Sequence, residues 1–122
     1  NRDLRMPRVL LAEDEFLIRA VMVDALDALG LDCIEAATGQ DALDVVAGSE
    51  ALSAIIVDIG LPDMSGEKVI EAALQQRPDV PIIRCSGGGQ PSGRGPAGVH
   101  VFPKPYSAAD LSKFVASLVN PS

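Results

Sequence analysis

The chain has 122 residues, of which 48% are hydrophobic and 22% are charged. This length and composition suit one globular domain with a hydrophobic core and leave no room for a second. The net charge of −7 opposes non-specific attraction to nucleic acid or anionic lipid, and no apolar run approaches the length of a membrane span. We therefore expect a cytoplasmic protein with no direct nucleic-acid partner and no membrane partner.

Short aliphatic runs alternate with longer segments in which apolar residues recur every three or four positions, a pattern typical of repeated β–α units around a parallel sheet. The predicted strands are 8–12, 32–36, 54–58, 80–85 and 99–102. The predicted helices are 15–29, 39–48, 66–76 and a last one that starts at Ser107. We expect the domain to span 8–119, with 1–7 as an N-terminal extension or tag remnant and 120–122 as a C-terminal tail, because Asn1 is not an initiator.

The connection at 87–98 breaks this alternation, because glycine or proline occupies most of its positions. Glycine costs about 1 kcal/mol and proline about 3 kcal/mol in a helix interior. We predict a fourth helix that is short, absent or mobile. The alternative is a flexible linker between two domains, which we disfavour because the segment that follows is too short to fold alone.

The two cysteines, Cys33 and Cys85, are isolated, and each lies inside an apolar segment. Neither has the near neighbour of a CxxC redox or zinc motif. We expect both to be buried, reduced thiols.

Acidic residues stand at the ends of two predicted strands: Glu13 and Asp14 follow the first, and Asp58 ends the third. In a doubly wound sheet, functional groups gather at the carboxyl ends of the strands. If the first and third strands are neighbours, the three carboxylates converge and repel one another unless a cation such as Mg²⁺ is bound. Each acid taken singly could be merely solvated. Together they predict a site for a divalent metal and a phosphoryl group.

A lysine and a serine are expected at the same edge. Lys104 lies between two prolines after the fifth strand, in a rigid segment that would hold its ammonium group as a counter-charge to a phosphoryl oxygen. Ser86 ends the fourth strand and offers a small hydroxyl, although a serine that caps a loop is an equal alternative there.

These residues and their spacing resemble the receiver domains of bacterial response regulators, over about 8–118. The resemblance rests on four motifs in order: Leu11-Ala12-Glu13-Asp14-Glu15, Ile56-Val57-Asp58-Ile59-Gly60-Leu61-Pro62-Asp63, Cys85-Ser86-Gly87 and Lys104-Pro105-Tyr106. It implies an α/β fold with a five-stranded parallel sheet in the flavodoxin-like order 2-1-3-4-5 and helices on both faces.

The resemblance also implies a function. Asp58 would accept a phosphoryl group from a phosphohistidine on a histidine kinase or histidine phosphotransfer protein, with Ser86 and Lys104 binding the phosphoryl oxygens. Glu13, Asp14, Asp58 and the Gly60 backbone carbonyl would hold Mg²⁺, or Mn²⁺ in its place. Such a domain is not an enzyme acting on an external substrate; it catalyses its own phosphorylation and dephosphorylation and thereby switches its binding to a downstream protein.

Three other functions are weighed against this one. A phosphorelay or phosphate-sink module cut from a hybrid histidine kinase would carry the same residues. An aspartyl phosphatase would need a second acid two residues after the nucleophile, where the chain has Gly60. A module that is never phosphorylated would not need the complete set of phosphorylation groups.

The chain departs from the family pattern at two places. Val101 stands where many receivers have an aromatic residue that turns inward on phosphorylation, and the glycine-rich 87–98 replaces a helix that usually belongs to the output surface. Ser86-Gly87 and Phe102-Pro103-Lys104-Pro105-Tyr106 are more similar to α-proteobacterial receivers, either free-standing or fused to hybrid histidine kinases.

Overall fold

The computed structural model describes residues 6–87 and 98–120. Five parallel strands form one sheet: β1 (Arg8–Ala12), β2 (Asp32–Ala36), β3 (Ala54–Asp58), β4 (Ile82–Ser86) and β5 (Val99–Pro103). Their order across the sheet is β2-β1-β3-β4-β5, which confirms the predicted 2-1-3-4-5 arrangement. Because β1 and β3 are neighbours, with Ala12 paired to Val57, the residues that follow them leave the sheet side by side.

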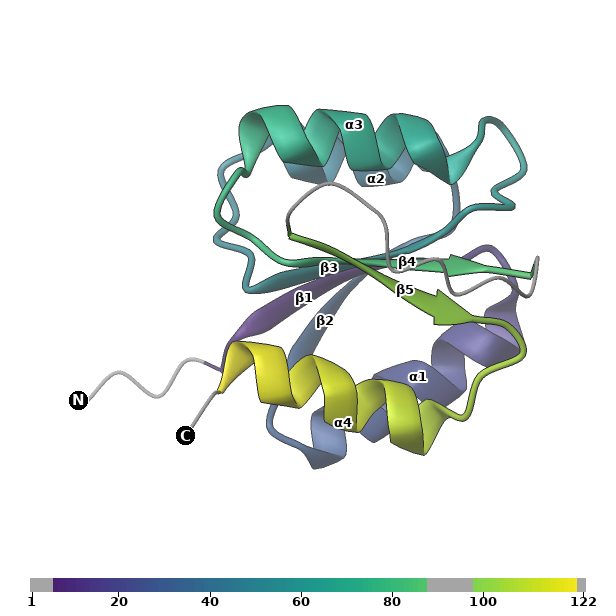
Figure 1. Cartoon of the computed structure of the whole chain (residues 1–122), viewed down its shortest axis with the longest axis vertical. Helices are drawn as coiled ribbons and strands as arrows, with labels where there is room; N and C mark the ends of the chain where they lie inside the picture. The colour runs from purple at the N-terminus through teal and green to yellow at the C-terminus, as the bar shows by residue number, and fades with distance from the viewer. Residues whose placement is uncertain (1–5, 88–97, 121–122) are drawn as a thin grey trace.

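Helices cover both faces of the sheet (Figure 1). On one face lie α1 (Phe16–Ala28) and α4 (Ala108–Val119), and on the other lie α2 (Gly39–Ala47) and α3 (Gly66–Gln76). This is the doubly wound α/β architecture that the alternating pattern predicts. Among the described residues, no helix is both long and apolar enough to cross a membrane.

The sheet divides the core into two apolar clusters. Alternate strand residues point to opposite faces, so Leu10 and Val57 pack with α2 and α3, whereas Leu11 and Ile56 pack with α1 and α4. Every residue of β3 is buried, including Asp58. Burial on both faces explains why the central strands β1 and β3 are nearly continuous apolar runs in the sequence.

Three helices begin at a residue whose hydroxyl accepts a hydrogen bond from a backbone N–H of the first turn. Thr38 caps α2 through the N–H of Asp41, Ser65 caps α3 through the N–H of Glu67, and Ser107 caps α4 through the N–H of Asp110. At the other end of α1, Gly30 has φ +83°, a left-handed conformation that glycine adopts without strain. Gly30 therefore stops this helix as predicted.

Most predicted boundaries agree with the structure to within one or two residues. The strand predicted at 80–85 begins at Ile82, because the N–H of Val80 donates to the carbonyl of Arg77 in a turn after α3. The predicted short, absent or mobile helix between β4 and β5 falls mainly on residues 88–97, which lie outside the described part of the chain.

Candidate functional site

The carboxyl ends of the strands bring the predicted site residues to one edge of the sheet. Asp58 ends β3, Ser86 ends β4, Glu13 follows β1, and Lys104 follows β5. A cavity of about 710 Å³ opens there. It is lined by Asp14, Glu15, Asp58, Ile59, Gly60, Ser86, Gly87, Lys104 and Pro105. This edge is where ligands bind in open α/β sheets.

Asp58 is a buried acid, only 5% exposed, with a partner for each carboxylate oxygen. Its Oδ1 accepts a hydrogen bond of 3.1 Å from the backbone N–H of Gly60, and its Oδ2 accepts one of 3.1 Å from Nζ of Lys104. An unpaired carboxylate at this depth would be costly. The two donors therefore hold the side chain of Asp58 in a fixed orientation in the cavity.

Glu13 is 1% exposed, and one of its carboxylate oxygens lies within 4.8 Å of one of Asp58. Its Oε2 accepts from the N–H of Glu15 at 3.0 Å, and its Oε1 accepts from the hydroxyl of Tyr106 at 3.4 Å. Burial, opposed by the hydrogen bond from Glu15 and reinforced by the charge of Asp58, raises the pKa of Glu13 to about 7. Burial therefore favours the protonated form of Glu13 more strongly than that of an exposed glutamate.

Lys104 provides the positive charge of the site. Its Nζ lies 3.1 Å from Oδ2 of Asp58 and 3.8 Å from Oε1 of Glu13, and the Lys104–Pro105 peptide bond is cis. Burial lowers the pKa of Lys104, but the hydrogen bond to Asp58 and the charges of Glu13 and Asp58 outweigh it, so the net pKa is raised. The ammonium group is therefore fully charged at neutral pH.

Carboxylate oxygens of Glu13, Asp14 and Asp58 all lie within 4.8 Å of one another. One lysine cannot neutralise three acids, and oxygen donors in this number and spacing are what hard divalent cations bind in proteins. Glu13 is already oriented by two hydrogen bonds, and Asp14 is exposed at the mouth of the site. These residues fit Mg²⁺.

Ser86 and Gly60 complete the predicted set. Both line the cavity, and the hydroxyl of Ser86 accepts a hydrogen bond of 3.3 Å from Nη1 of Arg84. The backbone N–H of Gly60 contacts Asp58, whereas the predicted role of its carbonyl as a metal ligand stays a prediction. All six predicted residues thus lie at one edge of the sheet.

Three residues that shape this site had no predicted role. Tyr106 donates to Glu13, Arg84 contacts Ser86, and Gly66 lies against the backbone of Asp58. A signal existed for Arg84, which is a charged residue inside an otherwise apolar strand. The contact of Tyr106 joins segments 93 positions apart, and the contact of Gly66 depends on how the loop after β3 folds back, and the sequence displays neither.

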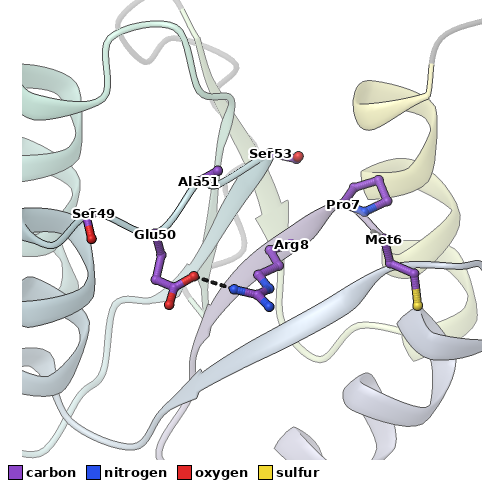
Figure 2. A pocket seen from close by; sticks show the side chains of 7 residues that line it. All are labelled: Met6, Pro7, Arg8, Ser49, Glu50, Ala51 and Ser53. Atoms are coloured by element: carbon purple, nitrogen blue, oxygen red, sulfur yellow. Dashed lines mark hydrogen bonds and ion pairs between the residues drawn. The ribbon is translucent and has the colours of Figure 1, made fainter. Parts of the chain in front are cut away.

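A second cavity, of about 590 Å³, lies at the opposite edge, beside the start of β1 (Figure 2). Its cation, Arg8, is paired with Glu50 and also contacts Oδ2 of Asp32 at 3.2 Å. These pairs are half-exposed and neutralise Arg8, so the cavity gathers no unpaired charge among its described residues. The chemistry is concentrated at the Asp58 edge.

Comparison with known proteins agrees with the resemblance found in the sequence. The model of the response regulator receiver domain family matches residues 9–115. The response regulator receiver protein CpdR of Brucella abortus is 30% identical over 110 residues, which cover 87% of this chain and 91% of CpdR. The sensor kinase CckA of the same organism is 30% identical over 117 residues, covering 91% of this chain but only 12% of the kinase.

Solved structures show the same fold. A response regulator receiver protein from Sinorhizobium medicae superposes with a TM-score of 0.85 at 24% identity, covering 98% of both chains. The receiver domain of the hybrid histidine kinase CckA superposes with a TM-score of 0.78 at 27% identity, covering 93% of this chain and 99% of that domain. With a family model that spans nearly the whole described chain and a sheet in the expected order, this protein belongs to the response regulator receiver domain family.

Proposed function

We propose that the protein is a phosphoacceptor: Asp58 takes a phosphoryl group from a phosphohistidine on a histidine kinase or histidine phosphotransfer protein. The observation that carries the proposal is the buried Asp58 carboxylate, bonded to Lys104 at 3.1 Å on the floor of a cavity that Ser86 also lines. An acid, an ammonium and a hydroxyl in this arrangement can place and neutralise a phosphoryl group. The exchange is expected to take place in the cytoplasm.

The transfer replaces one bond to phosphorus by another. An oxygen of the Asp58 carboxylate forms the new P–O bond while the P–N bond to the donor imidazole breaks, and the imidazole nitrogen keeps the electron pair. Lys104 neutralises charge on the phosphoryl oxygens, and the N–H of Gly60 keeps the carboxylate oriented. Attack of water on the phosphorus atom reverses the modification and releases phosphate.

Glu13, Asp14 and Asp58, with the backbone carbonyl of Gly60, would hold Mg²⁺, or Mn²⁺ in its place. When bound, the metal supplies charge neutralisation for the phosphoryl oxygens. The contribution of the chain is to prepare the ligands: Tyr106 and the N–H of Glu15 fix the carboxylate of Glu13 before any metal arrives.

A surface for the phosphoryl donor lies next to the site. Three apolar side chains at the start of α1 are exposed, with Phe16 at 66%, Leu17 at 75% and Val21 at 56%. Phe16, the first of them, lies two residues after Asp14, and neighbouring exposed apolar side chains mark surfaces for protein partners. We propose that the donor protein binds here and that phosphorylation then changes which downstream protein the domain binds.

The proposal is tested by incubation with acetyl phosphate and Mg²⁺ followed by intact mass measurement. The parent protein should gain one phosphoryl group, Asp58→Asn should gain none, and chelation of the metal should abolish the gain. Asp63→Asn is the matched control, because Asp63 lies in the same loop but its carboxylate accepts from the N–H groups of Gly39 and Gln40 instead. A parent that stays unmodified, or an Asp58→Asn protein that is modified equally, refutes the proposal.

A further inference from the structure

Arg84 is a charged residue in the middle of the apolar strand β4, between Ile83 and Cys85, both of which are buried. Its side chain points to the sheet face that α2 and α3 cover, the same face as that of Ser86 two residues later. The side chain is 30% exposed, so most of it lies against the protein. A long cation on this face needs an explanation beyond solubility.

The guanidinium group of Arg84 joins two elements. Its Nε donates to Oε2 of Glu67 at 2.9 Å, its Nη2 donates to the same oxygen, and its Nη1 donates to the hydroxyl of Ser86 at 3.3 Å. Glu67 lies in the first turn of α3, where the helix dipole favours a carboxylate. One planar group thus connects the start of α3 to the hydroxyl at the edge of the Asp58 cavity.

This contact determines how the hydroxyl of Ser86 can bond. A serine hydroxyl has one proton to donate and lone pairs to accept with. Because the guanidinium group only donates, the Ser86 oxygen accepts from Arg84, and its own proton stays available for another acceptor. A phosphoryl oxygen on Asp58 only accepts, so a hydroxyl polarised by Arg84 is a prepared donor for it.

We propose that Arg84 is a positioning residue that orients the Ser86 hydroxyl toward the phosphoryl group on Asp58, and that Glu67 holds Arg84 in place for this purpose. The inference rests on the proposed function of Asp58. It also makes the first turn of α3 part of the phosphorylation site, because a movement of Ser86 toward a phosphoryl oxygen pulls on the Glu67–Arg84 pair. The competing explanation is that the pair only attaches α3 to β4, as half-exposed ion pairs do with little gain in stability.

The test measures the affinity for beryllofluoride, a mimic of the phosphoryl group, by titration calorimetry in the presence of Mg²⁺. Loss of one charge-assisted hydrogen bond predicts a weakening of about tenfold for Arg84→Met and for Ser86→Ala. Because Arg84 acts through Ser86, the double variant should bind no more weakly than Ser86→Ala alone. Glu67→Gln should give a smaller loss, and Arg84→Lys should recover part of the affinity of Arg84→Met.

The matched control is Arg8→Met, which removes the arginine of the ion pairs at the opposite edge of the sheet and should leave the affinity at the parent value. Urea unfolding of each variant without beryllofluoride separates an effect on stability from an effect on binding. Parent affinity in Arg84→Met, or a loss that multiplies with that of Ser86→Ala, overturns the role of Arg84 while Asp58 phosphorylation stands. A parent protein that does not bind beryllofluoride at all overturns both proposals.

Discussion

Substitution of Gly66 tests how closely α3 packs against the end of β3. Gly66 is the first residue of α3, and a Cβ atom built on it would lie 2.4 Å from the backbone oxygen of Asp58. The same atom would lie 2.8 Å from Cγ1 of Val57 and 2.9 Å from Cα of Ile59. Since two of these three atoms belong to the backbone, a rotamer change cannot relieve the contact. Gly66→Ala must push α3 away from the end of β3.

The cost follows from two opposing effects. Overpacking of this kind destabilises by roughly 1–3 kcal/mol, whereas alanine in place of glycine in a helix recovers up to about 1 kcal/mol. We expect a net loss of about 1–2 kcal/mol in the free energy of unfolding, measured by urea denaturation. Phosphorylation by acetyl phosphate should also slow, because the strain falls on the backbone of Asp58.

Gly60→Ala is the matched control in the same loop. A Cβ atom at Gly60 would meet only Oδ1 of Asp58, at an ordinary contact distance of 3.9 Å. Its free energy of unfolding should stay within about 0.5 kcal/mol of the parent value, as for most substitutions without a clash. A Gly66→Ala protein as stable as Gly60→Ala would refute the close packing of α3 against Asp58.

Three further predictions concern the metal, α2 and the thiols. Because the pKa of Glu13 is raised to about 7, protons compete with Mg²⁺ for this side chain. The affinity for Mg²⁺, measured by calorimetry, should fall by up to about tenfold per pH unit below that value. An affinity that does not change with pH would contradict this. The guanidinium group of Arg77 donates to four backbone carbonyls at the end of α2 and in the segment that follows it. Arg77→Ala should therefore lower the free energy of unfolding in urea by about 2 kcal/mol without changing the affinity for beryllofluoride. Arg77→Lys should not restore the loss. Burial raises the pKa of both Cys33 and Cys85 to about 12. A thiol reagent at about pH 8 should therefore react slowly with the folded protein and rapidly with the protein unfolded in urea. Equal rates would show that the thiols are accessible.

Much of the fold could be predicted because the central strands β1 and β3 are buried on both faces. The run Ala54–Asp58 is buried at every position, so its apolar sequence marks the strand without ambiguity. The acids and the lysine could then be assigned to one site, because the carboxyl ends of parallel strands share an edge. Thiol burial was predicted less well: Cys85 is buried as expected, whereas Cys33, in a strand at the sheet edge, is only partly buried.

The contacts that orient the site residues could not be predicted, because they join segments that are far apart in the chain. The hydroxyl of Tyr106 reaches Glu13 across 93 positions, and the carboxylate of Asp63 binds the N–H of Gly39, capping a helix that precedes it. Neither residue type nor spacing specifies such pairs. The contact of Arg84 with Ser86 is local in the chain. The orientation of Arg84, however, depends on its hydrogen bond to Glu67, and only the packing of α3 brings Glu67 close enough.

The residues of the site are held by contacts from both faces of the sheet. This arrangement suggests which helix would respond to phosphorylation. Glu13, a proposed metal ligand, is held by groups beside α1 and α4, namely the N–H of Glu15 and the hydroxyl of Tyr106. Of the two groups that would meet the phosphoryl oxygens, the hydroxyl of Ser86 is connected to α3 through Arg84 and Glu67, whereas Lys104 contacts Asp58 directly. Val101, which pairs in register with Arg84, has no aromatic ring that could turn inward on phosphorylation. If Arg84 orients Ser86 as proposed, a change at Asp58 would be transmitted to the first turn of α3 through the hydrogen bonds of Ser86, Arg84 and Glu67, without an aromatic side chain at position 101.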